Sequence, residues 1–212
     1  MKTNCIHNPA PVISTIHAEV DIVNPTADMI HPTDVAVVMA RKGRYNDLSN
    51  RPFTVGQHLL LCDAIAQNHD EVKTDDDYLY IMLHDAHEAY IGDIPRPLKA
   101  LFDARTPGLI DSLEAALDRA IFERFGCPMP RPELVTARKE IDNIALAAEK
   151  EVAFASIRDR WTGLPEVSSS VLVAAAQVMQ WTHEEVFNTL SWRWYDLSKQ
   201  LQFERGEVAG HA

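Results

Sequence analysis

The residues best suited to chemistry lie in one stretch, residues 81–99, where histidine and acidic side chains recur at helical spacing. At 3.6 residues per turn, His84, Asp85 and Glu88 share one face of a predicted helix with Ile81. That face should enter the core, where an unpartnered carboxylate costs on the order of several kcal/mol unless it is paired or bound to a metal ion. A histidine beside an aspartate on an inward face suits a divalent cation. The alternative is a solvated polar face, which would leave a weak core of Met82, Leu83, Ala86 and Ala89.

Two further residues interrupt an apolar pattern in the same way. His58 lies on the predicted helical stripe formed by Val55, Leu59, Cys62 and Ile65. Asp142 lies on or beside another apolar face, seven residues after Val135. Taken singly, His58 reads as a satisfied core histidine and Asp142 as a surface residue. Together with His84 and Asp85 they would satisfy one divalent ion and leave coordination positions for water and substrate.

The sequence around these residues matches a known pattern. The matching segments are His84-Asp85-Ala86-His87-Glu88, Gly92-Asp93-x-Pro95-x-Pro97-x-Lys99, and Gly43-Arg44-Tyr45 with Arg51-Pro52-Phe53-Thr54-Val55-Gly56-Gln57-His58. They resemble the HD-domain metal phosphohydrolases, in particular bacterial 5′-deoxynucleotidases and phage dATP triphosphohydrolases. The resemblance covers roughly residues 33–152.

The resemblance implies a metal centre and a proton-transfer group. The implied ligands of one divalent ion (Co, Mn, Zn, Ni, Fe or Mg) are His58, His84, Asp85 and Asp142. Glu88 would be the catalytic acid/base that orients or deprotonates the attacking water. Asp93 would be a second catalytic carboxylate near the scissile ester.

The resemblance also implies substrate contacts. Arg44 would contact phosphate, and Tyr45 would pack on the sugar or base. Arg96 and Lys99 are nearby cations that could add positive charge for phosphoryl transfer, although ordinary loop charges are an equal alternative. His87 departs from the small residue typical of this position, and we expect it to support the site from behind the ligands or to be exposed.

The pattern of apolar residues predicts an all-α, single compact domain of about five to eight helices. Residues 1–31 read as an irregular N-terminal arm and residues 32–212 as the HD-type domain. Helices are expected at 33–42, 54–65, 75–92, 106–126, 132–157 and 182–197. Strand signals are nearly absent. The histidines outside the proposed site, including His17 and His31, read as surface residues.

Composition limits the partners. Hydrophobic residues make up 46% and charged residues 24%, as in globular proteins, and the net charge is −11. Such an acidic chain is a poor binder of nucleic-acid polymers or anionic membranes, so an anionic substrate needs positive charge concentrated at its site. Three scattered cysteines and a polar N-terminus without an apolar signal region favour a reducing, cytoplasmic location. Tryptophans on the last predicted helix suit packing or a homo-oligomer contact.

The sequence therefore predicts an enzyme that hydrolyses phosphate from a nucleotide, expected to be a deoxynucleotide. Two rivals remain: a cyclic-nucleotide phosphodiesterase with a similar metal cradle, and a non-catalytic regulatory HD module. The presence of all four ligand-type residues with Glu88 and Asp93 argues against the regulatory module. The sequence does not decide between a monophosphate and a triphosphate substrate.

Overall fold

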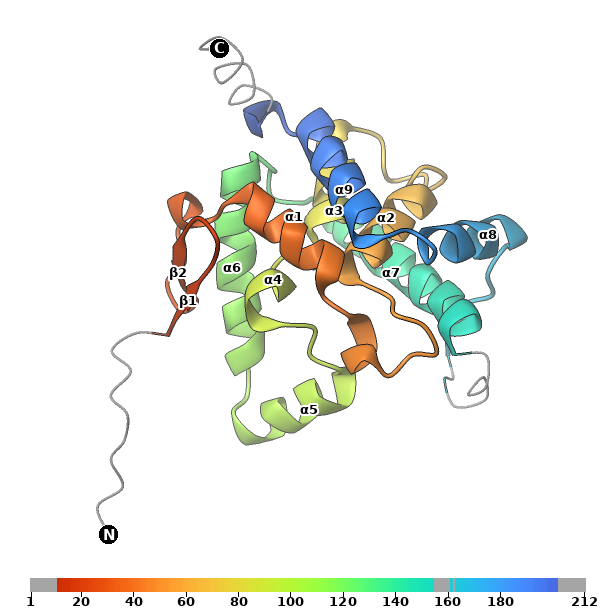
Figure 1. Cartoon of the computed structure of the whole chain (residues 1–212), viewed down its shortest axis with the longest axis horizontal. Helices are drawn as coiled ribbons and strands as arrows, with labels where there is room; N and C mark the ends of the chain where they lie inside the picture. The colour runs from red at the N-terminus through yellow and green to blue at the C-terminus, as the bar shows by residue number, and fades with distance from the viewer. Residues whose placement is uncertain (1–10, 155–160, 162, 202–212) are drawn as a thin grey trace.

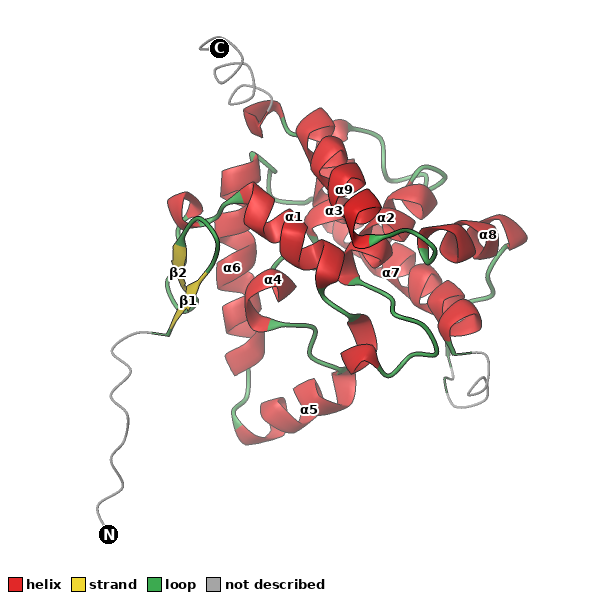
Figure 2. Cartoon of the chain, viewed as in Figure 1, coloured by secondary structure: helices red, strands yellow, loops and turns green. Residues whose placement is uncertain are grey.

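A computed structural model describes residues 11–154, 161 and 163–201. Its elements in chain order are β1 (Val12–Ser14), β2 (Glu19–Asp21), the 3-10 helix η1 (Ala27–Met29), α1 (Pro32–Arg41), the 3-10 turn η2 (Arg44–Asp47), α2 (Val55–Ala66), α3 (Asp75–Leu83), α4 (Glu88–Ile91), α5 (Arg96–Arg105), α6 (Leu109–Phe125), α7 (Pro132–Ala153), α8 (Ser169–Val178) and α9 (His183–Leu197). Helices dominate the described part of the chain, and the strands form one small hairpin (Figure 2). The predicted all-α class is confirmed.

Helix α2 occupies the centre of the molecule. It packs against α1, α3, α7, α8 and α9 (Figure 1), and every residue from 55 to 63 is buried. Because neighbours cover it on all sides, its apolar residues extend round the helix rather than along one stripe. The predicted capping box starts it: Thr54 Oγ1 accepts from the Gln57 backbone N–H at 3.2 Å, and Gln57 Oε1 accepts from the Thr54 N–H at 2.8 Å.

The single helix predicted over residues 75–92 is wrong, because the structure divides it into α3 and α4. Between them, residues 84–87 form turns. The Ala86 N–H donates to the Leu83 carbonyl at 3.0 Å and the Glu88 N–H to the Asp85 carbonyl at 3.0 Å. These bonds join residues three apart, which winds the chain more tightly than an α-helix and brings side chains three apart onto one side. The tighter winding decides where the site carboxylates point.

Local sequence features explain where the other predicted helices begin and end. Helix α6 lies between Gly108 and Gly126, whose φ angles of 73° and 66° suit glycine. Helix α7 follows its prediction, although the expected end at residue 157 lies outside the described residues. Helix α9 starts with the predicted capping box at Thr182, and its Trp194 Nε1 donates to the Met82 carbonyl at 3.3 Å. That bond fixes α9 against the end of α3, next to the candidate site.

The segment before residue 32 was expected to be irregular, and part of it is ordered. Strands β1 and β2 pair antiparallel, with Ile13 opposite Val20. Val20 and Ile30 are buried and belong to the main hydrophobic core. Three-residue strands are too short to show an alternating pattern, which is why the sequence did not indicate them. None of the helices in the described part of the chain has the length and hydropathy needed to cross a bilayer.

Candidate metal centre

Two histidine side chains meet at the interior end of α3. His58, on α2, is fully buried, and its Nδ1 lies 2.5 Å from Oε1 of Glu149. His84, directly after α3, has its Nδ1 at 2.7 Å from the Ile81 carbonyl oxygen. Both acceptors require a proton on Nδ1, so the lone pair of each imidazole sits on Nε2. These two Nε2 atoms face each other at 3.3 Å.

Two carboxylates complete the group. Asp85 Oδ2 lies 3.5 Å from His58 Nε2 and 3.4 Å from His84 Nε2. Asp142 Oδ1, from α7, lies 3.4 Å from His58 Nε2. Ligand atoms at about 2.1 Å from a tetrahedral ion stand about 3.4 Å apart, so these separations suit a divalent cation. The structure thus brings together all four residues that the sequence singled out as ligands, and this group could hold a metal ion.

Cys62 lies at the edge of this group. It is one turn after His58 on α2, and its Sγ lies 3.5 Å from His58 Nε2. Both cysteines in the described residues, Cys62 and Cys127, are buried free thiols. Burial raises the pKa of the Cys62 thiol, which favours the neutral form. A histidine and aspartate donor set remains the better match for an ion at this point.

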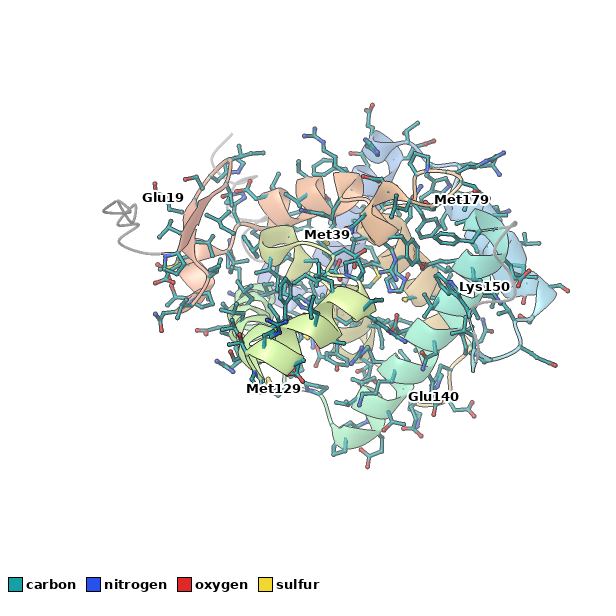
Figure 3. The ribbon with its side chains drawn as sticks, turned by 90° about the horizontal axis from the view of Figure 1, so that it is seen from below. Glu19, Met39, Met129, Glu140, Lys150 and Met179 are labelled. Atoms are coloured by element: carbon teal, nitrogen blue, oxygen red, sulfur yellow. The ribbon has the colours of Figure 1, made fainter. Side chains whose placement is uncertain are left out.

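Glu149 is a site residue that the sequence analysis missed. It is fully buried on α7, and besides His58 it accepts a hydrogen bond from Arg44 Nε at 3.1 Å and one from the Tyr45 hydroxyl. A carboxylate that holds the rear nitrogen of a histidine fixes the ring orientation and raises its basicity toward a metal. A signal was present: Glu149 follows Asp142 by seven residues, two helical turns, and so shares its face. Lys150, labelled in Figure 3, marks this end of α7.

Arg44 and Tyr45 lie on a strained turn beside this carboxylate. Tyr45, Asn46 and Asp47 have φ angles of 59°, 52° and 57°, in the left-handed region that non-glycine residues rarely adopt. The Tyr45 N–H donates to Asp93 Oδ2 at 2.9 Å, which ties the turn to the segment after α4. Arg44 NH1 also reaches Asp85 Oδ2 at 3.5 Å. Arg44 is therefore held by two carboxylates, rather than free for a phosphate alone.

The Tyr45 ring has its own protein partners. It packs edge-on against Phe154, with ring centroids 4.9 Å apart, and lies 5.7 Å from Trp161. Burial and the nearby Glu149 carboxylate raise the pKa of the Tyr45 hydroxyl, so it stays protonated and donates to that carboxylate. The sequence analysis did not place Phe154 or Trp161 in this region.

Glu88 and His87 lie beside the ligands. One oxygen of Glu88 comes within 4.8 Å of a ligand atom of Asp85 and of His87. Its Oε2 is buried with no hydrogen-bond partner among the described residues. Burial, followed by repulsion from Asp85 and Asp93, raises the pKa of Glu88 well above its usual range. Glu88 therefore has a buried carboxyl oxygen without a partner among the described residues and a raised pKa at the edge of the ligand group.

His87 is buried, with its Nδ1 2.8 Å from Asp118 Oδ1 of α6. Burial disfavours the charged ring, but the hydrogen bond and charge of Asp118 raise the pKa of His87 to about 9. Of the two roles expected for it, a buried supporting position fits this geometry and exposure does not.

The two cations predicted from the loop lie on α5, away from these contacts. Lys99 Nζ is 2.6 Å from Glu114 Oε2 and 3.1 Å from Asp111 Oδ1, both on α6. Arg96 is exposed at the start of α5. Within the described residues, no hydrogen bond or ion pair joins Arg96 or Lys99 to the four donor side chains. Lys99 therefore places its positive charge against α6 rather than at the donor atoms.

Two histidines interpreted as surface residues form a second small cluster. His17 Nδ1 lies 2.5 Å from Asp34 Oδ1, and the rings of His17 and His31 stack with centroids 4.0 Å apart. Asp34 is buried at the start of α1. These contacts tie the hairpin to α1. The His17 ring is 44% exposed, so the surface interpretation holds for that residue but misses the cluster.

Comparison with known proteins places the chain among relatives. No family model matches it. The uncharacterized protein YfdR of Escherichia coli is 31% identical over 123 residues, which span 58% of this chain and 61% of that relative. The uncharacterized protein RCAP_rcc00048 of Rhodobacter capsulatus is 30% identical over 158 residues, 69% of this chain and 76% of the relative. The chain belongs to the same family as RCAP_rcc00048. Both relatives are uncharacterized, so the argument for function comes from the site.

Proposed function

We propose that this protein is a metal-dependent phosphohydrolase of the HD-domain kind that acts on a nucleotide, with a deoxynucleotide as the expected substrate. The convergence of His58, His84, Asp85 and Asp142 carries the proposal. The two imidazole Nε2 atoms and Asp85 Oδ2 lie 3.3–3.5 Å from one another, and Asp142 Oδ1 lies 3.4 Å from His58 Nε2. Such a group needs positive charge between its members, since like partial charges in the interior repel strongly.

The four donors would hold the ion through two nitrogens and two oxygens. A divalent ion bound there supplies acidity to a water molecule and polarises a phosphoryl oxygen. Manganese, iron, cobalt, nickel and zinc suit this mixed donor set, and magnesium suits it less. Glu149 and the Ile81 carbonyl keep the histidine rings in the orientation that binding requires.

Glu88 would handle the proton of the attacking water. Its buried oxygen has no other partner among the described residues, and it lies beside Asp85 without being needed as a fifth ligand. Its raised pKa suits a group that takes up and releases a proton. Asp93 fixes the Tyr45 turn through the backbone, a supporting role that is compatible with the proposed second carboxylate.

The first experiment is a substrate panel. The protein is loaded in turn with manganese, cobalt and zinc, and incubated with deoxyribonucleoside and ribonucleoside mono- and triphosphates and with cyclic nucleotides. Release of phosphate or triphosphate from a deoxynucleotide supports the proposal, and Asp85→Ala should abolish it. Hydrolysis of cyclic nucleotides alone would establish the phosphodiesterase. If the metal-loaded protein cleaves none of them, the regulatory module is the better account.

Glu88→Gln separates catalysis from metal binding. The amide keeps the size of the side chain but cannot take up a proton, so turnover should fall by about 10²–10⁴-fold. Metal content should stay at the wild-type level, because the four ligands remain. Near-normal turnover in Glu88→Gln would remove Glu88 from proton transfer, and loss of the ion would make it a ligand.

A further inference from the structure

A cavity adjoins the metal centre at His84. It has a volume of about 250 Å³ and lies between α3, α6 and the start of α7. Its lining includes Tyr80, His84, Asp118, Arg119, Phe122 and Arg138. Met129, at its edge, is labelled in Figure 3. Because His84 belongs both to this lining and to the ligand group, the cavity and the candidate metal centre share a wall.

Two arginines give the cavity positive charge. Arg138, on α7, has a buried Nε with no hydrogen-bond partner among the described residues, and its guanidinium also interacts with the Tyr80 side chain. Arg119, on α6, is exposed, and no ion pair joins it to another described residue. Asp118 is the acidic member of the lining, and its carboxylate is hydrogen-bonded to His87. The cavity therefore offers two guanidinium groups in a chain of net charge −11.

The arginine on α7 stands one turn from the metal centre. Arg138 precedes Asp142 by four residues on α7, and Tyr80 precedes His84 by four residues along α3. Four residues correspond to a rise of about 6 Å along a helix. Tyr80 and Phe122 pack edge-to-face, with ring centroids 5.7 Å apart, and line the same cavity as Arg138. A ligand with one phosphate at the donor atoms can thus place a second anionic group near the arginines.

We propose that this cavity binds the phosphate chain of a nucleoside polyphosphate, with Arg119 and Arg138 holding the phosphates next to the one at the metal centre. The inference rests on the proposed function and extends it from nucleotides in general to polyphosphates. Guanidinium groups pair with phosphate oxygens through two parallel hydrogen bonds. Of the three cations first expected to do this, Arg44 pairs with Glu149 and Asp85, Lys99 pairs with two α6 carboxylates, and Arg96 is exposed at the start of α5.

Binding of inorganic triphosphate tests the proposal without requiring turnover. Titration calorimetry compares inorganic triphosphate with inorganic phosphate on the purified full-length protein. Arg138→Ala and Arg119→Ala should each weaken triphosphate binding by about tenfold or more and leave phosphate binding and metal content unchanged. Lys139→Ala is the matched control, since Lys139 is an exposed cation next to Arg138 on α7, and it should bind triphosphate like the wild type.

Wild-type triphosphate affinity in both arginine variants would overturn the subsite, as would failure of the wild type to prefer triphosphate over phosphate. If Arg138→Ala does not fold, the exposed Arg119 still provides the test. The two proposals fail separately. A protein that hydrolyses no nucleotide but still needs the arginines to bind triphosphate refutes the hydrolase and supports the subsite. A protein that hydrolyses nucleotides but binds triphosphate equally well without the arginines supports the hydrolase and refutes the subsite.

Discussion

Glu149 contacts three other side chains of the site with its two carboxylate oxygens. Oε1 accepts from His58 Nδ1, while Oε2 accepts from Arg44 Nε and from the Tyr45 hydroxyl. Burial opposes its charge, but the Arg44 guanidinium and His58 hold the pKa of Glu149 below its usual value. The buried Glu149 carboxylate thus sets the tautomer of His58 and neutralises Arg44, which also contacts Asp85.

Glu149→Gln tests this arrangement. A glutamine cannot neutralise Arg44, and its amide N–H₂ group either opposes the His58 N–H or turns toward the arginine. We expect metal affinity, measured by competition with a chelator, to fall by about 10–100-fold. The metal-free protein should also lose about 3–5 kcal/mol of unfolding free energy, as when a buried ion pair loses one partner.

Glu140→Gln is the control for that variant. Glu140, labelled in Figure 3, is on the same helix, and its side chain is 61% exposed beside His69. An exposed pair of this kind contributes about 0–1 kcal/mol, so neither metal affinity nor stability should change much. Equal metal affinity in Glu149→Gln and Glu140→Gln would show that Glu149 does not position His58.

At the scale of elements, the tight turns between α3 and α4 matter most. In one continuous α-helix, His84 and Asp85 would point about 100° apart. The hydrogen bonds between residues three apart bring Asp85 and Glu88 to the same side, and their carboxylates lie within 4.8 Å. Helical spacing was therefore enough to predict which residues gather here. It could not predict the break in the helix, because a tight turn and an α-helix have similar local sequence preferences.

Other differences from the sequence-based expectations have similar causes. Helices α5 and α8 were not predicted: α5 carries Leu98, Leu101 and Phe102 at helical spacing but buries no residue, and α8 buries only two. Glu149 lies among alanines, a pattern typical of any solvated helix face, and only tertiary contacts with α2 and the Tyr45 turn bury it. The ligands were predictable because a charged residue on an apolar face is unusual, whereas supporting residues such as Glu149 look ordinary.

The start of α3 illustrates how an element is fixed by electrostatics. Asp77 Oδ2 accepts from the backbone N–H groups of Lys73 and Thr74, and Arg131 from the segment before α7 donates to the same carboxylate. Burial alone would raise the pKa of Asp77, but these hydrogen bonds hold it below the usual value of an aspartate. Asp77 therefore joins α3 to α7, the two elements that carry His84 and Asp142.

Asp77→Ala should lower the free energy of unfolding at pH 7 by about 1–2 kcal/mol, the usual contribution of a capping carboxylate. A carboxylate whose folded pKa is depressed stabilises above its unfolded pKa, and this contribution is lost as the pH falls. The difference between the wild type and Asp77→Ala, measured by urea unfolding, should thus shrink below about pH 4. Asp75→Ala, an exposed residue of the same turn, should change stability by less. A difference that is independent of pH would show that the Asp77 charge contributes nothing.

Across the whole molecule, the candidate ligands join parts of the chain that are far apart in sequence. His58 comes from the central α2, His84 and Asp85 from the end of α3, and Asp142 from the middle of α7 (Figure 1). Residue 58 is separated from residue 142 by 84 positions (142 minus 58). The contacts of α2 with both α3 and α7 hold the three segments in place. An ion at this point would cross-link the core of the fold.

Metal addition should therefore stabilise the whole chain. A ligand that binds only the folded state at about 100 times its Kd adds about 2.7 kcal/mol to the free energy of unfolding. For a chain of this size that corresponds to a rise in Tm of roughly 5–10 °C. We expect this rise when manganese, cobalt or zinc is added to chelator-treated protein, measured by thermal unfolding. Asp142→Ala and His84→Ala should not show it.

His183→Ala is the matched control for the thermal experiment, because this exposed histidine begins α9 away from the donor atoms, and it should keep the full rise. Metal analysis of the same proteins separates specific from surface binding. Ions that bind to surface carboxylates would raise the Tm of Asp142→Ala and wild type alike, and that result would contradict the site. His84 directly follows α3, and Asp142 lies on α7. If both variants lose the metal-dependent rise in Tm, the ion must be bound by residues from both elements. Binding by a pair of histidines alone would not depend on Asp142.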